Sequence, residues 1–214
     1  MVAARAGGLS MGSFEFFFSF YGLLLGLSVA VIATGVATAI QHRKKVRIGK
    51  LTLLLATFVA LDIATFWDSA WTNYRDFPFS YGLLVAGLAI ALTYFIAATL
   101  VFPHAIEDGD SLDDHFWANK RIVLLLLVAA NALAMVMTLL GNVGKPGVQL
   151  LLINYAVNMA LYLALVVPAA FAKRARLVFW TLGAHVVIYL LIAVATGVAP
   201  MLPTPAPVAA GAAP

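Results

Sequence analysis

One apolar stretch of the chain carries a carboxylate at its centre. Residues 51–74 read LTLLLATFVALDIATFWDSAWTNY, and Asp62 falls about halfway along them. A charged side chain at the centre of a bilayer costs about 2.5–3.5 kcal/mol on insertion scales, so such residues usually face a bundle interior or a water-filled cavity. We therefore expect any ion- or proton-linked chemistry of this protein to involve Asp62.

Three polar residues that follow Asp62 share its helical face. Thr65, Ser69 and Thr72 lie three, seven and ten residues after it, which places all four on one side of an α-helix. Such a stripe beside a carboxylate could line a water-filled entry. The alternative is that Asp62 is neutral and hydrogen-bonds to a neighbouring helix, because polar groups hold membrane helices together at an average of about 0.6 kcal/mol per pair.

Other polar side chains also lie deep in apolar stretches. His185 lies roughly eight residues, or about 12 Å, inside the last stretch, and we expect it to pair with Asp62 to relay a proton or bind a cation. Asn131 is central in another stretch, and Asn154 and Asn158 share a face one turn apart. These five residues form the predicted polar site. The alternative is packing alone, because buried amides need hydrogen-bond partners in any bundle.

The composition identifies lipid as the solvent of these stretches. The 214 residues are 64% hydrophobic and 10% charged, whereas a soluble domain is about 45–50% apolar and about 25% charged. A helix needs about 20 apolar residues to cross a bilayer, and backbone groups in lipid must be hydrogen-bonded internally, which favours helices. The predicted fold class is therefore all-α: a polytopic integral membrane protein with a bundle of six transmembrane helices.

The predicted transmembrane domain covers residues 14–199. The first apolar run is too long for the h-region of a signal peptide, which has about 7–15 residues, so we interpret it as an uncleaved span. We expect a flexible extracytoplasmic N-terminus over residues 1–13 and a Pro- and Ala-rich extracytoplasmic tail over 200–214. The six spans are expected at about 14–40, 51–71, 79–102, 121–140, 148–171 and 177–199.

The distribution of basic residues predicts the orientation. Of the 13 Lys and Arg residues, ten lie in the segments after the first, third and fifth spans, and three lie in the segments of the other side. The positive-inside rule places the ten in the cytoplasm and both termini outside. The same rule explains the net charge of +4 without nucleic acid as a partner. Short loops and Ala-rich spans favour a bacterial inner membrane.

The loop before the fourth span is the one long polar segment. Ser111 and Asp114 predict a capping box there, and we favour a short interfacial helix that leads into the fourth span. The alternative is a docking loop for a partner or a cation, although the spacing of its acidic residues does not match an EF-hand. These residues are Glu107, Asp108, Asp110, Asp113 and Asp114.

Small residues on the first span predict close helix packing. Gly22, Gly26 and Ala30 recur every four residues, the small-xxx-small pattern of contacting membrane helices. The contact could lie within the chain, with a membrane protein partner or in a homo-oligomer.

The sequence lacks the motifs of several enzyme classes. There are no cysteines, which excludes disulfides, thiolate catalysis and Cys-ligated metal. There is no H-E-x-x-H motif and no Gly-rich phosphate loop, and we predict no metal and no cofactor.

The leading interpretation is a non-catalytic membrane subunit or sensor that engages a partner. The alternatives are a small channel or a proton- or cation-linked transporter with a polar site at the membrane midplane, and an enzyme that acts on a lipid or quinone.

Overall fold

Six α-helices make up a computed structural model that describes residues 13–75, 77, 80–104 and 111–198. Each helix is long and apolar enough to cross a membrane, so the predicted all-α bundle of six spans is confirmed. The helices are α1 (Ser13–Gln41), α2 (Lys50–Tyr74), α3 (Tyr81–Thr99), α4 (Leu112–Leu140), α5 (Val148–Phe171) and α6 (Ala175–Val198).

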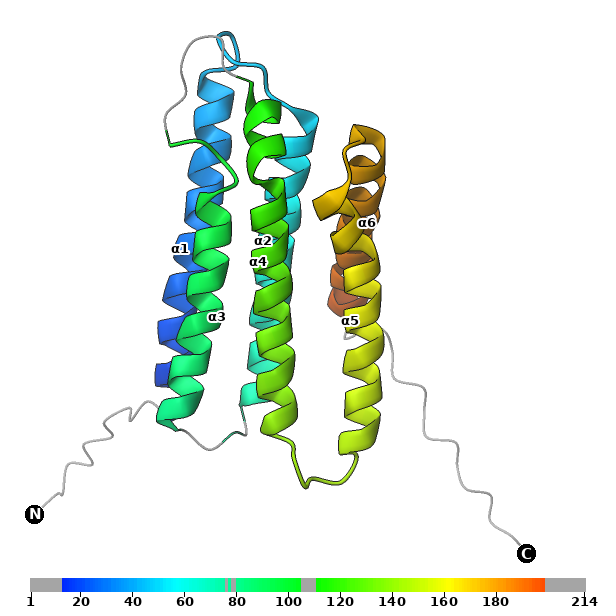
Figure 1. The fold of residues 1–214 in the computed structure, drawn as a ribbon. Coiled ribbons are helices and arrows are strands. Elements are labelled where there is room, and N and C mark those ends of the chain that lie inside the picture. The colour runs from blue at the N-terminus through cyan, green and yellow to red at the C-terminus, as the bar shows by residue number, and fades with distance from the viewer. Residues whose placement is uncertain (1–12, 76, 78–79, 105–110, 199–214) are drawn as a thin grey trace, which may run out of the picture.

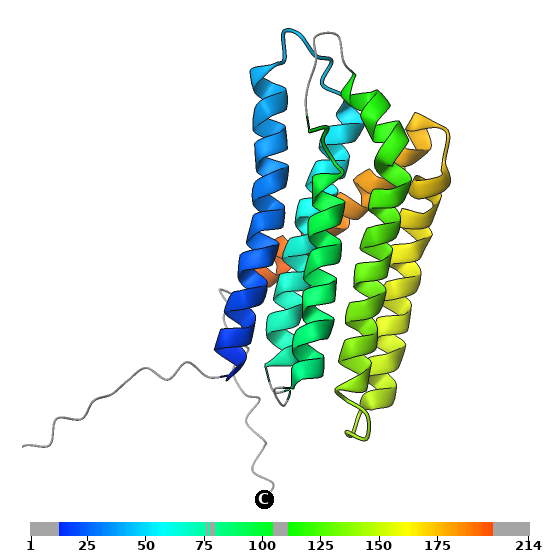
Figure 2. The ribbon, with the colours of Figure 1, turned by 60° about the vertical axis from the view of Figure 1, so that its left-hand side comes forward.

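The helices form two layers of three. Helices α3, α4 and α5 lie side by side in the front layer of Figure 1, and α1, α2 and α6 lie behind them. Each front helix packs on the helix behind it, so α2 and α4 are the central pair. The turned view in Figure 2 shows α6 crossing behind this pair at an angle. A polar residue at the middle of α2 is therefore surrounded by protein on several sides.

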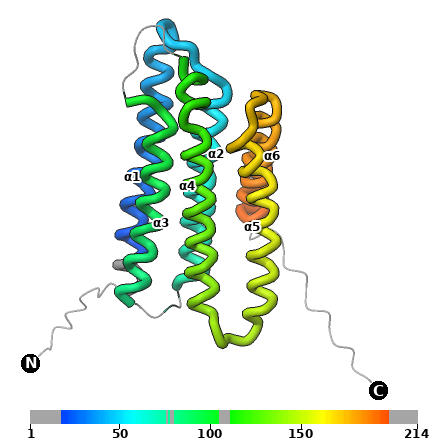
Figure 3. Tube along the Cα trace, viewed as in Figure 1, coloured from blue at the N-terminus to red at the C-terminus, as the bar shows by residue number. Residues whose placement is uncertain are grey.

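The two ends of the bundle differ in charge. Helices α1, α3 and α5 finish at one end, where α2, α4 and α6 begin, and the tube in Figure 3 shows this end at the top. We call it the basic end. Its exposed cations are Arg43, Lys44, Lys45, Arg47, Lys50, Lys173, Arg174 and Arg176. The opposite end holds the turn between α4 and α5, where Gly144 and Gly147 adopt positive φ angles of 79° and 84° that favour glycine.

Helix α4 begins earlier than the sequence predicted. Ser111 is its N-cap residue, but the serine side chain makes no capping hydrogen bond, so the predicted capping box does not form. One continuous helix replaces the expected interfacial helix and span, because Leu112 and Phe116 are buried and extend the packed face of α4. The Thr52 hydroxyl on α2 donates to the Leu112 carbonyl at 2.8 Å and fixes this start against the bundle.

One basic residue, Lys120, lies inside the bundle. We expected it in a cytoplasmic loop, yet it lies two turns into α4 and is only 5% exposed. Its ammonium lies 4.8 Å from the centre of the Trp117 ring. It also donates to three carbonyls at the C-terminal end of α5. The side chain therefore joins α4 to α5.

The small residues of α1 differ in their surroundings. A Cβ at Gly22 would lie 3.0 Å from the Trp67 ring of α2, whereas a Cβ at Gly26 would have no neighbour within 4 Å. Ala30 is exposed. The packing of Gly22 is therefore within the chain, and an oligomer contact through Gly26 and Ala30 stays a prediction.

Gly87 lies where α3 packs closely against α1. A Cβ at this position would overlap the ring and hydroxyl of buried Tyr21. We expect Gly87→Ala to lower the free energy of unfolding by about 1–3 kcal/mol through overpacking. Gly183→Ala is the matched control, because a Cβ there meets no atom within 4 Å and alanine favours a helix by about 0.5–1 kcal/mol. Equal thermal melting of the two variants in detergent would contradict this close contact.

Candidate functional site: a polar cluster beneath a cavity

Asp62 lies at the middle of α2 and is 1% exposed. Asp62 is buried because α2 is central in its layer and packs on α1, α3, α4 and α6. A buried carboxylate needs hydrogen bonds from its surroundings to offset the water that it loses. The hydrogen-bond partners of Asp62 therefore decide what chemistry its carboxylate can support.

Five helices contribute to the polar cluster around this carboxylate. The Tyr189 hydroxyl on α6 donates to Asp62 Oδ1 at 2.5 Å. The Asn131 amide on α4 donates to Asp62 Oδ2 at 2.9 Å, and the Tyr162 hydroxyl on α5 donates to the same oxygen at 3.5 Å. The Tyr94 hydroxyl on α3 lies 3.2 Å from the Asn131 amide nitrogen. We call these five residues the Asp62 cluster.

The hydrogen bonds of Asn131 define its orientation. Its amide nitrogen donates to Asp62 and also to the Leu127 carbonyl at 3.0 Å. Both partners are acceptors, so the nitrogen and not the oxygen must face them. Asn131 thus ties α4 to α2 and holds the carboxylate in place. Among the described residues, none of the groups that hydrogen-bond to Asp62 is a cation.

His185 is close to the cluster but does not hydrogen-bond to Asp62, which corrects the expected pair. The hydroxyl of Tyr189, one turn further along α6, reaches the carboxylate instead. The His185 ring packs among aromatic rings, with centroid distances of 4.6 Å to Tyr189, 5.1 Å to Tyr162 and 5.1 Å to Phe58. His185 is 4% exposed, and its Nδ1 has no hydrogen-bond partner among the described residues.

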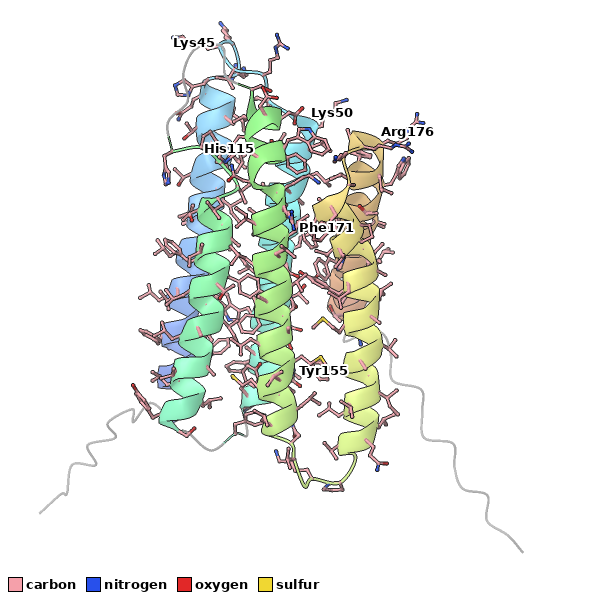
Figure 4. The ribbon with its side chains drawn as sticks, viewed as in Figure 1. Lys45, Lys50, His115, Tyr155, Phe171 and Arg176 are labelled. Atoms are coloured by element: carbon pink, nitrogen blue, oxygen red, sulfur yellow. The ribbon has the colours of Figure 1, made fainter. Side chains whose placement is uncertain are left out.

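A cavity of about 320 Å³ lies between α2, α4, α5 and α6, in the half of the bundle toward the opposite end. Its deep part is formed by Asn131, Tyr162, His185 and Tyr189. Figure 4 shows Tyr155, another lining residue, between α4 and α5. The volume is in the range of about 300–1,000 Å³ that is usual for small-molecule sites. Three members of the Asp62 cluster, Asn131, Tyr162 and Tyr189, therefore form the floor of the cavity, whereas Asp62 and Tyr94 do not line it.

Part of the predicted polar stripe and both amides of α5 line the same cavity. Thr65 and Ser69 line the cavity, whereas Thr72 is exposed and its hydroxyl bonds to the Asp68 carbonyl of its own helix. Asn154 and Asn158 line the outer part of the cavity. Asn158 donates to Asn154 and not to the cluster, because both residues are exposed on the first turns of α5.

The tyrosines are the functional candidates that sequence reasoning missed. Tyr94, Tyr162 and Tyr189 all lie within apolar spans, and each hydroxyl lies within hydrogen-bonding distance of Asp62 or Asn131. A buried tyrosine hydroxyl usually has a hydrogen-bond partner, so tyrosines deep in a span were a usable signal.

The acidic residues of the predicted docking loop are only partly covered by the structure. Glu107, Asp108 and Asp110 lie outside the described residues. Asp113 and Asp114 lie in the first turn of α4. Within the described ranges, no group of three His, Cys, Asp or Glu side chains could hold a metal ion.

Comparisons with protein-family models, with curated proteins and with solved structures find no match to this chain. The site itself must therefore support any functional assignment.

Proposed function

We propose that this protein is a membrane sensor that binds a small hydrophilic molecule in the cavity above the Asp62 cluster. The observation that carries the proposal is the lining of this cavity. Amide and hydroxyl groups from four helices converge on it, and among the described lining residues there is no Lys, Arg, Asp or Glu. Groups that both donate and accept hydrogen bonds suit a polar ligand without a large net charge.

The cavity lies in the half of the bundle that we assign to the extracytoplasmic side. The basic end carries most of the exposed Lys and Arg residues, and the positive-inside rule assigns such an end to the cytoplasm. Thr65, Asn154 and Asn158 line the cavity and are exposed, so its outer part is accessible from the surroundings of the bundle. A bacterial inner membrane protein built in this way would sample molecules outside the cell.

The hairpin of α5 and α6 is the element through which binding would be transmitted. Within the described part of the chain, α5 packs on α4 and α6 packs on α2, and the hairpin meets no other helix. Tyr162 and Tyr189 attach it to Asp62 by hydrogen bonds, and both tyrosines also line the cavity. A ligand that competes for these hydroxyls would favour a different position of the hairpin. The basic turn between α5 and α6 would present this change to a cytoplasmic partner.

A second candidate is a proton- or cation-linked transporter, and the surroundings of Asp62 favour it. A carboxylate at the middle of a span, held by uncharged donors beneath a cavity, is a typical proton or cation site of membrane transporters. A transporter would carry protons or a cation across a liposome, whereas a sensor would bind its ligand without flux.

The cysteine-free chain allows a direct test of the hydrated cavity. Ser69→Cys in intact cells is expected to react with a charged, membrane-impermeant thiosulfonate reagent, because Ser69 lines the cavity and a thiol reacts as its thiolate. Leu191→Cys is the control, since Leu191 is 63% exposed on α6 but does not line the cavity.

Three outcomes of this labelling are informative. Labelling of Ser69→Cys alone, with protection by a small polar compound, supports the sensor. Equal labelling of both variants would show that access of the reagent to Ser69→Cys does not depend on the cavity. No labelling of Ser69→Cys from outside, but labelling in inverted vesicles, would overturn the proposed orientation.

A further inference from the structure

A second pocket lies at the basic end, separate from the cavity above the Asp62 cluster. It has a volume of about 570 Å³ and lies where α2, α4 and α6 begin. Figure 4 labels Lys50, the first residue of α2, and Arg176, near the start of α6, at this end of the bundle. The lining residues are Ile48, Gly49, Lys50, Leu51, Asp113, Ala175, Arg176, Phe179 and Trp180.

Two cations of the pocket suit a phosphate group. Lys50 and Arg176 are both exposed and both line it, one as a compact ammonium and the other as a planar guanidinium. Basic pockets between helices at a membrane surface are typical binding places of lipid headgroups.

Asp113 gives the pocket a third charge, of opposite sign. Its Oδ1 is fully buried and has no hydrogen-bond partner among the residues that the structure describes. The carboxylate is pressed against Gly49, where a Cβ would overlap it. Asp113 also lines the pocket, so a ligand that brings a positively charged donor as well as a phosphate matches all three charges.

The remaining lining is apolar, and its two aromatic residues are exposed. Phe179 is 43% exposed and Trp180 is 66% exposed, both on the first turns of α6. Tryptophan is enriched at the level of lipid headgroups. A headgroup in the pocket would therefore place its acyl chains along the apolar face of α6.

We propose that this pocket binds the headgroup of an aminophospholipid in the leaflet of the basic end. Its phosphate lies between Lys50 and Arg176, and its primary ammonium donates to Asp113. A choline headgroup has no N–H donor for the carboxylate. A glycerol headgroup brings hydroxyls but leaves the charge of Asp113 without a cation. Phosphatidylethanolamine supplies both the phosphate and the charged donor.

The test is lipid binding to the delipidated full chain, measured by native mass spectrometry. Phosphatidylethanolamine, phosphatidylcholine and phosphatidylglycerol with the same acyl chains are titrated separately. We expect one phosphatidylethanolamine to bind about tenfold more tightly than the other two, the effect of roughly one hydrogen bond to a charged group. Equal or tighter binding of phosphatidylglycerol to the native protein would overturn the proposal.

Variants locate the site. Asp113→Asn is expected to abolish the preference for phosphatidylethanolamine, and Lys50→Gln with Arg176→Gln to weaken its binding. The control, Lys44→Gln with Lys173→Gln, removes two exposed cations of the same end that do not line the pocket. If the control weakens binding as much as the pocket variant, the attraction is not specific to this pocket. The selectivity of the native protein tests the proposal even if a variant does not fold.

Discussion

Replacement of Asp62 by asparagine is expected to lower the free energy of unfolding by about 1–3 kcal/mol, the cost of leaving a buried polar group without its partner. Asp62 accepts hydrogen bonds at both carboxylate oxygens. Asparagine offers one oxygen, and its amide nitrogen would face a donor. Either Tyr189 or Asn131 would therefore lose its acceptor at a position that is only 1% exposed.

The measurement is equilibrium unfolding in mixed micelles, with Asp68→Asn as the control. Asp68 lies on the same helix but is exposed, so its change should stay within about 0.5 kcal/mol. If both variants unfold at the same denaturant concentration as the native protein, the hydrogen bonds of Asp62 do not stabilise the bundle.

The same two variants distinguish the proposed functions. A folded Asp62→Asn protein that loses proton or cation flux in liposomes, while Asp68→Asn keeps it, would establish the transporter in place of the sensor. A native protein that shows no flux, but whose Ser69→Cys thiol is protected by a ligand, would establish the sensor. The stability measurement is needed first, because loss of flux from an unfolded variant carries no information.

Lys120→Met is expected to have the largest effect on stability, about 3 kcal/mol, because three acceptors lose a charged donor. The ammonium donates to the carbonyls of Ala169, Ala170 and Ala172 at 2.7, 3.1 and 2.7 Å. These carbonyls lie at the C-terminal end of α5, where a helix has no further N–H groups to offer. A positive charge there also interacts favourably with the helix dipole. Methionine keeps the apolar stem and removes only the charge and its donors.

Arg121→Met is the matched control for Lys120→Met. Arg121 is the next residue of α4 and is exposed, and its guanidinium lies 4.5 Å from the centre of the Phe171 ring. Loss of an exposed contact of this kind costs about 0.5–1 kcal/mol. Similar losses for the two variants in mixed-micelle unfolding would contradict the capping role of Lys120.

Composition and the length of the apolar runs were sufficient to predict the fold class. Six runs of about 20 apolar residues are expected to cross the bilayer as helices, since helices satisfy their own backbone hydrogen bonds. The start of α4 was predicted less well. The polar residues before position 121 resemble a loop in sequence, but Leu112, Phe116 and Lys120 are buried by neighbours that are distant in the chain.

The sequence also determined that Asp62 is buried, because a carboxylate at the centre of an apolar span must avoid lipid. Only the tertiary structure decided its partners. The two-layer arrangement of the helices brings Tyr189 and Asn131 to the carboxylate and leaves His185 among aromatic rings. Helical periodicity gives the face of each helix on which a residue lies. It does not give the rotation and depth of one helix relative to another, and a hydrogen bond requires both to within about an ångström.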